Sequence, residues 1–159
     1  MPDVHKITPF LWFDNQAEEA ASFYVSLFPD SRVISVDRFD DPETGKRMAL
    51  VATFELAGQR IMAMNAGPHF KLDEAFSFMV DCEDQAEVDR LWEALTAGGG
   101  APSQCGWLKD RFGLSWQIIP RALPRLMSDP DPAKAKRVTA AMLKMQKIDV
   151  AALEAAYRG

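Results

Sequence analysis

The sequence has 159 residues, of which 48% are hydrophobic, so it can bury a core as one domain or as two small packed halves, and disorder is excluded. Its net charge of -5 is unevenly spread, because residues 121–159 hold eight Lys/Arg against four Asp/Glu and follow an acidic body. No run approaches the roughly 20 apolar residues that cross a bilayer, the start lacks the features of a signal peptide, and no Lys/Arg stripe interleaved with aromatic residues indicates nucleic-acid binding. We therefore expect a soluble cytoplasmic protein with no membrane or nucleic-acid partner.

The chain begins with a predicted strand and a capped helix. The apolar run ITPFLWF (7–13) is typical of a buried strand. Apolar residues then recur at helical spacing over 17–28, and Pro29 ends the pattern. Asn15 and Glu18 have the spacing of a capping box, in which each side chain accepts a backbone amide of the other residue. The helix is therefore predicted to start at Asn15.

Three predicted strands follow and form an antiparallel meander, because only the short segments DDPETG and AGQ separate them. Their ranges are 31–39, 46–56 and 60–64. Gly67-Pro68 then interrupts regular structure, and 76–81 predicts a new strand.

The second half begins a similar series. Asp84 and Glu87 repeat the capping box, and GGG (98–100) ends the helix where a positive φ is usual. Two strands are then predicted at 103–110 and 113–120, with a weak one near 101–104.

The basic tail differs from both halves. Its prolines divide it into short pieces, and helical spacing predicts one amphipathic helix over 135–145 and a second over 149–157, capped by Asp149. Helices this short need a docking surface. The charge contrast predicts that the tail folds against an acidic body, its own or a partner's.

The order strand, capped helix, strand meander therefore occurs twice, although the shared letters QAE of the two helix starts can also be explained as good helix-starting chemistry alone. With the blocks at 7–33, 67–95, 98–120 and 142–157, this order resembles the PhnB-like, demethylubiquinone methyltransferase-like branch of the glyoxalase/bleomycin-resistance/extradiol-dioxygenase (vicinal oxygen chelate) superfamily. The resemblance implies an α+β fold: a single domain over 1–159, in which two βαβββ modules (about 5–66 and 74–120) form a cupped mixed sheet, plus a C-terminal helical tail (about 121–159). It also implies a homodimer.

Enzymes of this superfamily typically hold a divalent ion with His and Glu side chains, two from each module. The matching positions here are approximate on three strands and fall at Thr8 or Pro9, among the methionines of IMAM (61–64), and at Ala75 or Ser77. DRFGLSWQ fits the superfamily's D-x-x-G-x-x-x-E pattern, with Gln117 in place of the Glu. A neutral amide beside Thr, Met and Ala leaves no anion to offset a dication. We expect no metal and no cofactor.

Aromatic, apolar and weakly polar residues remain to line the cup, and they suit a flat hydrophobic or aromatic small molecule. Neighbouring strand residues point to opposite faces, so some of these residues are expected to be plain core. His5 precedes the first strand, whereas His69 lies in the linker between the modules and is the histidine expected to touch a ligand. The predicted ligand-binding residues are Thr8, Phe10, Trp12, Met62, Met64, His69, Ser77, Phe78, Cys105, Trp107, Trp116 and Gln117.

The leading hypothesis is a metal-free protein that binds a small molecule. The alternative is an enzyme of isomerase, lyase or dioxygenase type that uses a metal at Gln117 or a Cys105 thiolate, although Lys109 lies too far along the strand to activate that thiol. Dimerisation with the tail as a clasp is a third hypothesis. The two cysteines are expected to be reduced thiols. Methyl transfer is disfavoured, because the glycines at 98–100 follow a helix and precede a strand, the reverse of a nucleotide-binding turn.

Overall fold

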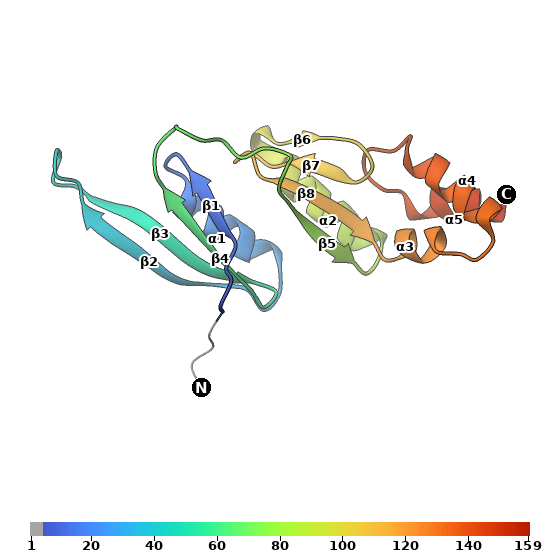
Figure 1. Ribbon diagram of the computed structural model, residues 1–159, viewed down its shortest axis with the longest axis horizontal. Coiled ribbons are helices and arrows are strands. Elements are labelled where there is room, and N and C mark those ends of the chain that lie inside the picture. The colour runs from blue at the N-terminus through green and yellow to red at the C-terminus, as the bar shows by residue number, and fades with distance from the viewer. Residues whose placement is uncertain (1–4) are drawn as a thin grey trace. The chain divides into compact units, whose positions relative to one another are not determined.

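The computed structural model describes residues 5–159, which divide into two compact units, the first ending at Leu72 and the second starting at Asp73 (Figure 1). Each unit contains a four-stranded mixed sheet and a helix of its own, and the second also contains the tail helices. We call residues 5–72 the first module, 73–120 the second module and 121–159 the tail. The predicted α+β class, with two modules and a helical tail, is confirmed.

The first module has the strand order β1-β4-β3-β2, in which β1 is parallel to β4 and the other pairs are antiparallel. The predicted meander is confirmed. Ala57 and Gly58 have φ of 47° and 85°, as a two-residue hairpin loop between β3 and β4 requires. The elements are β1 (Phe10–Phe13), α1 (Ala17–Leu27), β2 (Arg32–Asp40), β3 (Arg47–Leu56) and β4 (Gln59–Asn65).

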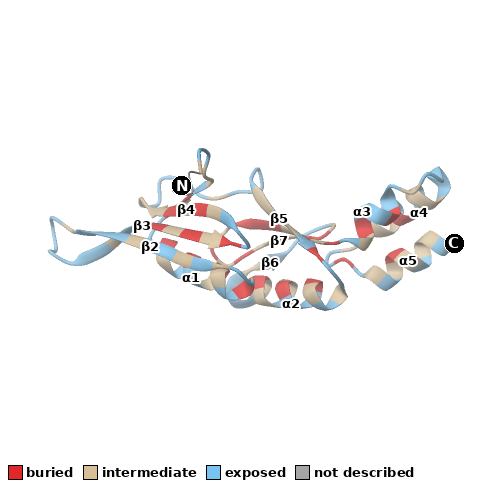
Figure 2. Cartoon of the chain, turned by 90° about the horizontal axis from the view of Figure 1, so that it is seen from below, coloured by how far each residue is buried: buried red, intermediate tan, exposed pale blue. Residues whose placement is uncertain are grey.

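One face of this sheet is covered by α1, which Figure 2 shows running beside the strands. Leu11 and Phe13 of β1 are buried, whereas Phe10, the first residue of β1, is 50% exposed. The alternation follows from the period of two in a strand, which sends neighbouring side chains to opposite faces. The buried face therefore carries the core, and no helix of the described first module covers the opposite face.

The start of α1 differs from the prediction. The helix begins at Ala17 with Gln16 as its N-cap, and that side chain makes no capping bond. The amide of Ala17 instead donates to Asn65 Oδ1 of β4 at 2.8 Å. The capping box predicted at Asn15 and Glu18 is wrong. Asn65 of β4 accepts the first helical amide instead, and sequence spacing cannot reveal a partner so far along the chain.

The second module repeats this topology with the order β5-β8-β7-β6, in which β5 is parallel to β8. The strand predicted at 103–110 is much shorter than expected, because Cys105 and Gly106 have φ of 57° and 85° and form a turn before β7. The weak strand near 101–104 is present as β6. The elements are β5 (Ser77–Cys82), α2 (Gln85–Thr96), the 3-10 turn η1 (Ala97–Gly99), β6 (Ala101–Pro102), β7 (Trp107–Lys109) and β8 (Ser115–Pro120).

The predicted cap of α2 is confirmed. Asp84 accepts the amide of Glu87 at 3.0 Å. The Glu87 carboxylate reaches back to the amide of Glu83 at 2.8 Å, one residue before the cap. Both helix-starting amides are satisfied locally, so α2 needs no side chain from another strand to begin.

The tail forms three helices that enclose a small core of their own with the end of the second module. The prediction missed α3, because Pro124 reads as a helix breaker although it lies in the first turn, where proline is tolerated. The helices are α3 (Ala122–Met127), α4 (Pro132–Met142) and α5 (Val150–Arg158). The buried residues of this core are Leu123, Leu126, Val138, Ile148 and Leu153.

Basic residues of the tail pair with acids of the second module. Lys147 Nζ lies 2.8 Å from Asp89 Oδ1, and Arg121 Nε lies 3.0 Å from Asp81 Oδ2. The tail therefore docks on its own chain, one of the two alternatives that the charge contrast left open. Across residues 5–159, no helix is long and apolar enough to span a bilayer.

Candidate functional site

The uncovered face of the first sheet carries the residues that the sequence singled out on β1 and β4. Phe10 lies opposite Met62, and Trp12 lies opposite Met64. All four have the strand parity opposite to Leu11 and Ile61, which are buried against α1. Thr8, two residues before Phe10, shares this parity. We call this surface the first open face.

Trp12 is fixed by the segment that follows β4. Its indole Nε1 donates to the carbonyl of Gly67 at 2.9 Å. The ring of Phe70 meets the Trp12 ring edge-on, with centroids 4.9 Å apart. His69 lies in the same segment and is exposed. The linker thus places an exposed histidine next to Phe70, which contacts Trp12 of the first open face. Contact between His69 and a ligand stays a prediction.

The uncovered face of the second sheet carries a pair of polar side chains, Gln117 and Ser77. Gln117 Nε2 donates to Ser77 Oγ at 3.0 Å. Met79 and Trp107 lie on either side of Gln117 in the register of the sheet, and Met79 is 63% exposed. We call this surface the second open face. Met79 was missed in the sequence, although its parity with Ser77 is a signal that could have found it.

Two predicted residues lie on the other side of this sheet. Trp116 is 1% exposed, and its indole donates to Asp110 Oδ2 at 2.9 Å. Phe78 meets Trp116 edge-on with centroids 5.2 Å apart. Both belong to the helix-covered core, so the structure does not bring them together with Gln117.

Asp110, the acid of the D-x-x-G segment, is 3% exposed and organises the turn between β7 and β8. One carboxylate oxygen accepts the amides of Phe112 and Leu114 at 2.9 and 3.1 Å, while the other accepts the Trp116 indole. All of these bonds hold the turn, so the acid acts as a structural acceptor.

Neither thiol lies on an open face. Cys105 sits in the turn before β7, not in a strand as expected, and Lys109 pairs with Glu74 instead. Cys82 is fully buried, and desolvation, followed by the charges of Glu87 and Asp81, raises its pKa to about 12. Both cysteines are free. A thiol with so high a pKa carries little thiolate at neutral pH, so Cys82 is not a nucleophile.

The donor set does not fit a divalent ion. The positions that match the superfamily's ligands hold a threonine, methionines, a serine and an amide, and that amide already donates to Ser77. Within residues 5–159, no three His, Cys, Asp or Glu side chains are grouped so as to hold a metal. The chemistry of these side chains is that of a neutral surface with hydrogen-bonding capacity.

The family model for 3-demethylubiquinone-9 3-methyltransferase matches residues 5–119. The chain belongs to this family. The match confirms the PhnB-like resemblance that the sequence blocks indicated. The match ends at residue 119, so α3, α4 and α5 lie outside it. No protein with a curated description matches the chain in sequence.

The chain is similar to several solved structures. The PhnB protein of Bacillus cereus, which carries the same methyltransferase label, is 36% identical with a TM-score of 0.67 and aligns over 73% of this chain and 99% of its own. A Pseudomonas aeruginosa protein of 23% identity aligns over 72% and 96%, with a TM-score of 0.60, and shares the fold. A glyoxalase/bleomycin resistance protein from Albidiferax ferrireducens aligns over 72% and 96%, with 10% identity and a TM-score of 0.47.

The glycines at 98–100 serve the turn after α2. Gly98 and Gly99 have φ of 68° and 113°. A Cβ on Gly100 would lie 2.6 Å from the carbonyl oxygen of Leu95 and 2.9 Å from that of Lys109. The glycines thus allow the chain to pass close to its own backbone between α2 and β6, so their presence is explained without a bound nucleotide.

Proposed function

We infer that this protein binds a hydrophobic or aromatic small molecule without a metal ion, using residues of its open faces. The observation that carries the proposal is the second open face, where the neutral pair Gln117 and Ser77 is flanked by Met79 and Trp107. Exposed apolar and aromatic side chains with a few polar groups favour a flat, weakly polar ligand. Asp81, which has the same parity on β5, is paired with Arg121 and is therefore not a free partner for a dication.

A buried hydroxyl supports a ligand that carries a polar group. Ser115 is 1% exposed and lies beside Ser77 in the sheet. Its Oγ has no hydrogen-bond partner within the described residues. A buried hydroxyl without a partner is costly, so a ligand that displaced the side chains covering Ser115 would gain more from a carbonyl or hydroxyl group than from a hydrocarbon.

The test uses a neutral aromatic probe and two tryptophans. We expect the fluorescence of N-phenyl-1-naphthylamine to rise on binding to the wild type. Trp107→Ala should raise the dissociation constant roughly fivefold to tenfold, because an aromatic contact is lost. Trp92→Ala is the matched control, since Trp92 lies on α2 and not on an open face. Equal effects of both changes, or no binding to the wild type, would reject the proposal.

Elemental analysis tests the alternative that the protein is a metal-dependent enzyme. Protein purified without chelator or affinity metal is expected to hold less than one equivalent of Zn, Mn, Fe or Ni in total. Stoichiometric metal that is lost in Gln117→Ala would replace the binding hypothesis with a metalloenzyme. A thiol enzyme would instead require unusually fast alkylation of Cys105 at neutral pH.

Methyl transfer, the activity in the family's description, is not our proposal for this chain. The glycine cluster follows α2 and precedes β6, whereas a methyl-donor nucleotide is usually held by a glycine turn that follows a strand and precedes a helix. We expect calorimetry to detect no micromolar binding of S-adenosylmethionine. Micromolar affinity would overturn this expectation.

We further propose a homodimer in the cytoplasm. Exposed apolar residues such as Phe10, Phe76 and Met79 support an assembly, because large exposed apolar surfaces mark binding sites for ligands or partners. The two free thiols fit a reducing compartment. Analytical ultracentrifugation is expected to show twice the chain mass of 17.7 kDa.

A further inference from the structure

We propose that the tail is a clamp that holds the loop 103–106 and thereby fixes Trp107 on the second open face. The tail lies beyond the residues matched by the family model, so the clamp is an addition to the βαβββ modules. The link between the clamp and ligand binding rests on the proposed function. The clamp itself rests on three sets of contacts along residues 145–150, and a fourth set joins the loop to Trp107.

The first set joins the tail to the loop by backbone hydrogen bonds. The amide of Cys105 donates to the carbonyl of Met145 at 2.8 Å, and the amide of Gly106 donates to that of Gln146 at 2.8 Å. Without the tail, both amides of a tight turn would lose their acceptors. Buried backbone amides are nearly always paired, so these bonds specify where the tail lies.

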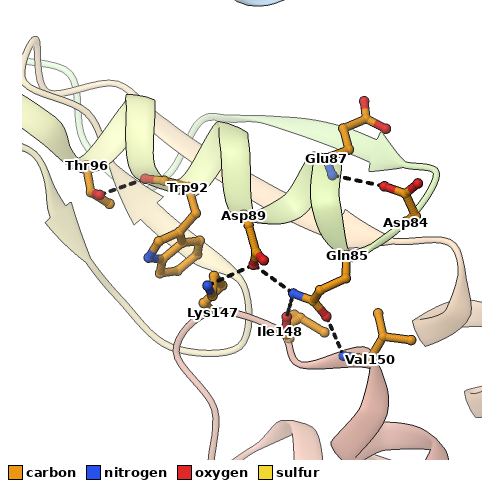
Figure 3. Close-up of polar contacts among 9 residues, drawn as sticks. All are labelled: Asp84, Gln85, Glu87, Asp89, Trp92, Thr96, Lys147, Ile148 and Val150. Atoms are coloured by element: carbon orange, nitrogen blue, oxygen red, sulfur yellow. Dashed lines mark hydrogen bonds and ion pairs between the residues drawn. The ribbon is translucent and has the colours of Figure 1, made fainter.

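The second set is made by one side chain of α2. Gln85 Nε2 donates to the carbonyl of Ile148 at 3.0 Å, and Gln85 Oε1 accepts the amide of Val150 at 2.7 Å (Figure 3). The primary amide thus bonds to the tail backbone as a neighbouring strand would. Its nitrogen also donates to Asp89 at 2.9 Å, and Asp89 pairs with Lys147.

The third set is a close packing contact at a glycine. Gly106 is buried with a φ of 85°, and a Cβ there would lie 2.9 Å from Ile119 Cδ1 and 3.1 Å from Ile148 Cγ1. Ile148 itself is fully buried among the tail residues. The tail therefore packs onto bare backbone at the residue that immediately precedes Trp107.

The fourth set connects the loop to the site. The amide of Trp107 donates to the carbonyl of Gln104, and the amide of Ser103 donates to the carbonyl of Trp107. Since β7 has only three residues, this turn and β8 determine where the Trp107 side chain points. Trp107 lies beside Gln117 in the sheet. Loosening the loop therefore loosens one wall of the proposed binding surface.

The experiment compares two glutamines at the same place in the repeated letters QAE. Gln85→Ala removes both hydrogen bonds to the tail, whereas Gln16→Ala changes an exposed N-cap whose side chain makes no capping bond. We expect hydrogen–deuterium exchange in the peptide 103–108 to rise roughly tenfold in Gln85→Ala and to stay unchanged in Gln16→Ala. Exchange in 115–120 reports on the sheet and should change in neither.

Two further variants guard against a trivial result. Gln85→Glu keeps the acceptor for Val150 but loses the donor to Ile148 and faces the Asp89 carboxylate, so loop exchange should also rise. Ile148→Ala keeps every hydrogen bond and removes only packing, and it should raise exchange at 103–108 as well. Unchanged exchange of the loop in all three variants would overturn the clamp. Equal increases over the whole second module would mean general unfolding and would overturn it too.

The binding arm separates this inference from the proposed function. If the wild type binds N-phenyl-1-naphthylamine, Gln85→Ala is expected to weaken binding about threefold to tenfold, and unchanged affinity with a loosened loop would overturn the link to Trp107. If the wild type binds no probe, the proposed function fails. The exchange result still decides whether the tail holds the loop.

Discussion

The two modules begin their helices in different ways, although the letters QAE occur at both starts. In the first module, Gln16 makes no capping bond and Asn65 of β4 accepts the first helical amide. In the second, Asp84 caps α2 from within the chain, and the next residue, Gln85, binds the tail. The glutamine of QAE is thus an exposed N-cap residue in the first module, whereas in the second it binds the backbone of the tail.

The difference arises from what lies beside each helix. Once Asp84 and Glu87 satisfy the amides at the start of α2, the Gln85 side chain is available to bond outward. The tail supplies a carbonyl and an amide at the matching spacing. A local motif therefore gains a role from a segment more than sixty residues later.

The largest effect is expected from the core of the tail. Ile148→Ala removes a fully buried side chain that packs against Gly106, and such truncations cost about 2–5 kcal/mol of the free energy of unfolding. Urea denaturation followed by circular dichroism measures it. Ile34→Ala, at a residue that is 37% exposed in the first module, should cost well below half as much. Similar costs would show that Ile148 is not a core residue.

A smaller effect is expected where β4 holds the start of α1. Asn65→Ala removes the acceptor for the Ala17 amide and a donor to the Ala49 carbonyl, so the unfolding free energy should fall by about 1–3 kcal/mol. Asn15→Ala, at the residue that spacing alone selects, should change it by less than about 0.5 kcal/mol. The reverse ranking would restore the capping box that the structure contradicts.

The cap of α2 should contribute less than Asn65. Asp84→Ala leaves the Glu87 amide without its acceptor and is expected to cost about 1 kcal/mol. Asp84→Asn, which retains a side-chain oxygen, should recover most of that stability. Equal losses in the two variants would mean that the carboxylate charge, and not the capping bond, matters.

The smallest effect concerns pH. Hydrogen bonds from Lys147 and then Gln85 hold the pKa of Asp89 below its ordinary value of 3.8. A depressed carboxyl pKa stabilises the folded state above the ordinary pKa, and this contribution disappears as the pH falls through the lower folded value. Because the pair is exposed, the loss should be a few tenths of a kcal/mol.

Unfolding free energies at several pH values between about 5 and 2 test this contribution. Lys147→Gln removes the charged partner, so its stability should fall less steeply than that of the wild type over the same interval. Parallel pH profiles for the two proteins would show that Asp89 is not stabilised by Lys147.

Most of the fold follows from local patterns. Alternating and helical apolar spacing predicted both meanders and both main helices, because these patterns depend on neighbours in the chain. The strand at 103–110 was predicted too long because Cys105 adopts a positive φ, which no spacing rule indicates for a residue other than glycine. The Asn65 cap was missed for a related reason: its partner lies 48 residues away.

The site was only partly predictable. The sequence named Phe10, Trp12 and Met62 for their apolar and aromatic character, and the structure places them on one face of the first sheet. It also grouped Trp116 with Gln117, although neighbouring strand residues point to opposite sides. Which side is covered depends on where α2 packs. Met79 has the parity of Ser77 but was overlooked, because the sequence does not show that Gln117 and Trp107 lie on the neighbouring strands beside it.

The bonds between the loop and the tail also have an order in time. A ribosome adds roughly 5–20 residues per second, so the carbonyls of Met145 and Gln146 are made about 2–8 seconds after the amides of Cys105 and Gly106 that they accept. Once β8 has been made, the growing chain contains the strands of both sheets but not yet the acceptors for this turn. A segment that is synthesised after both sheets therefore completes the turn beside Trp107.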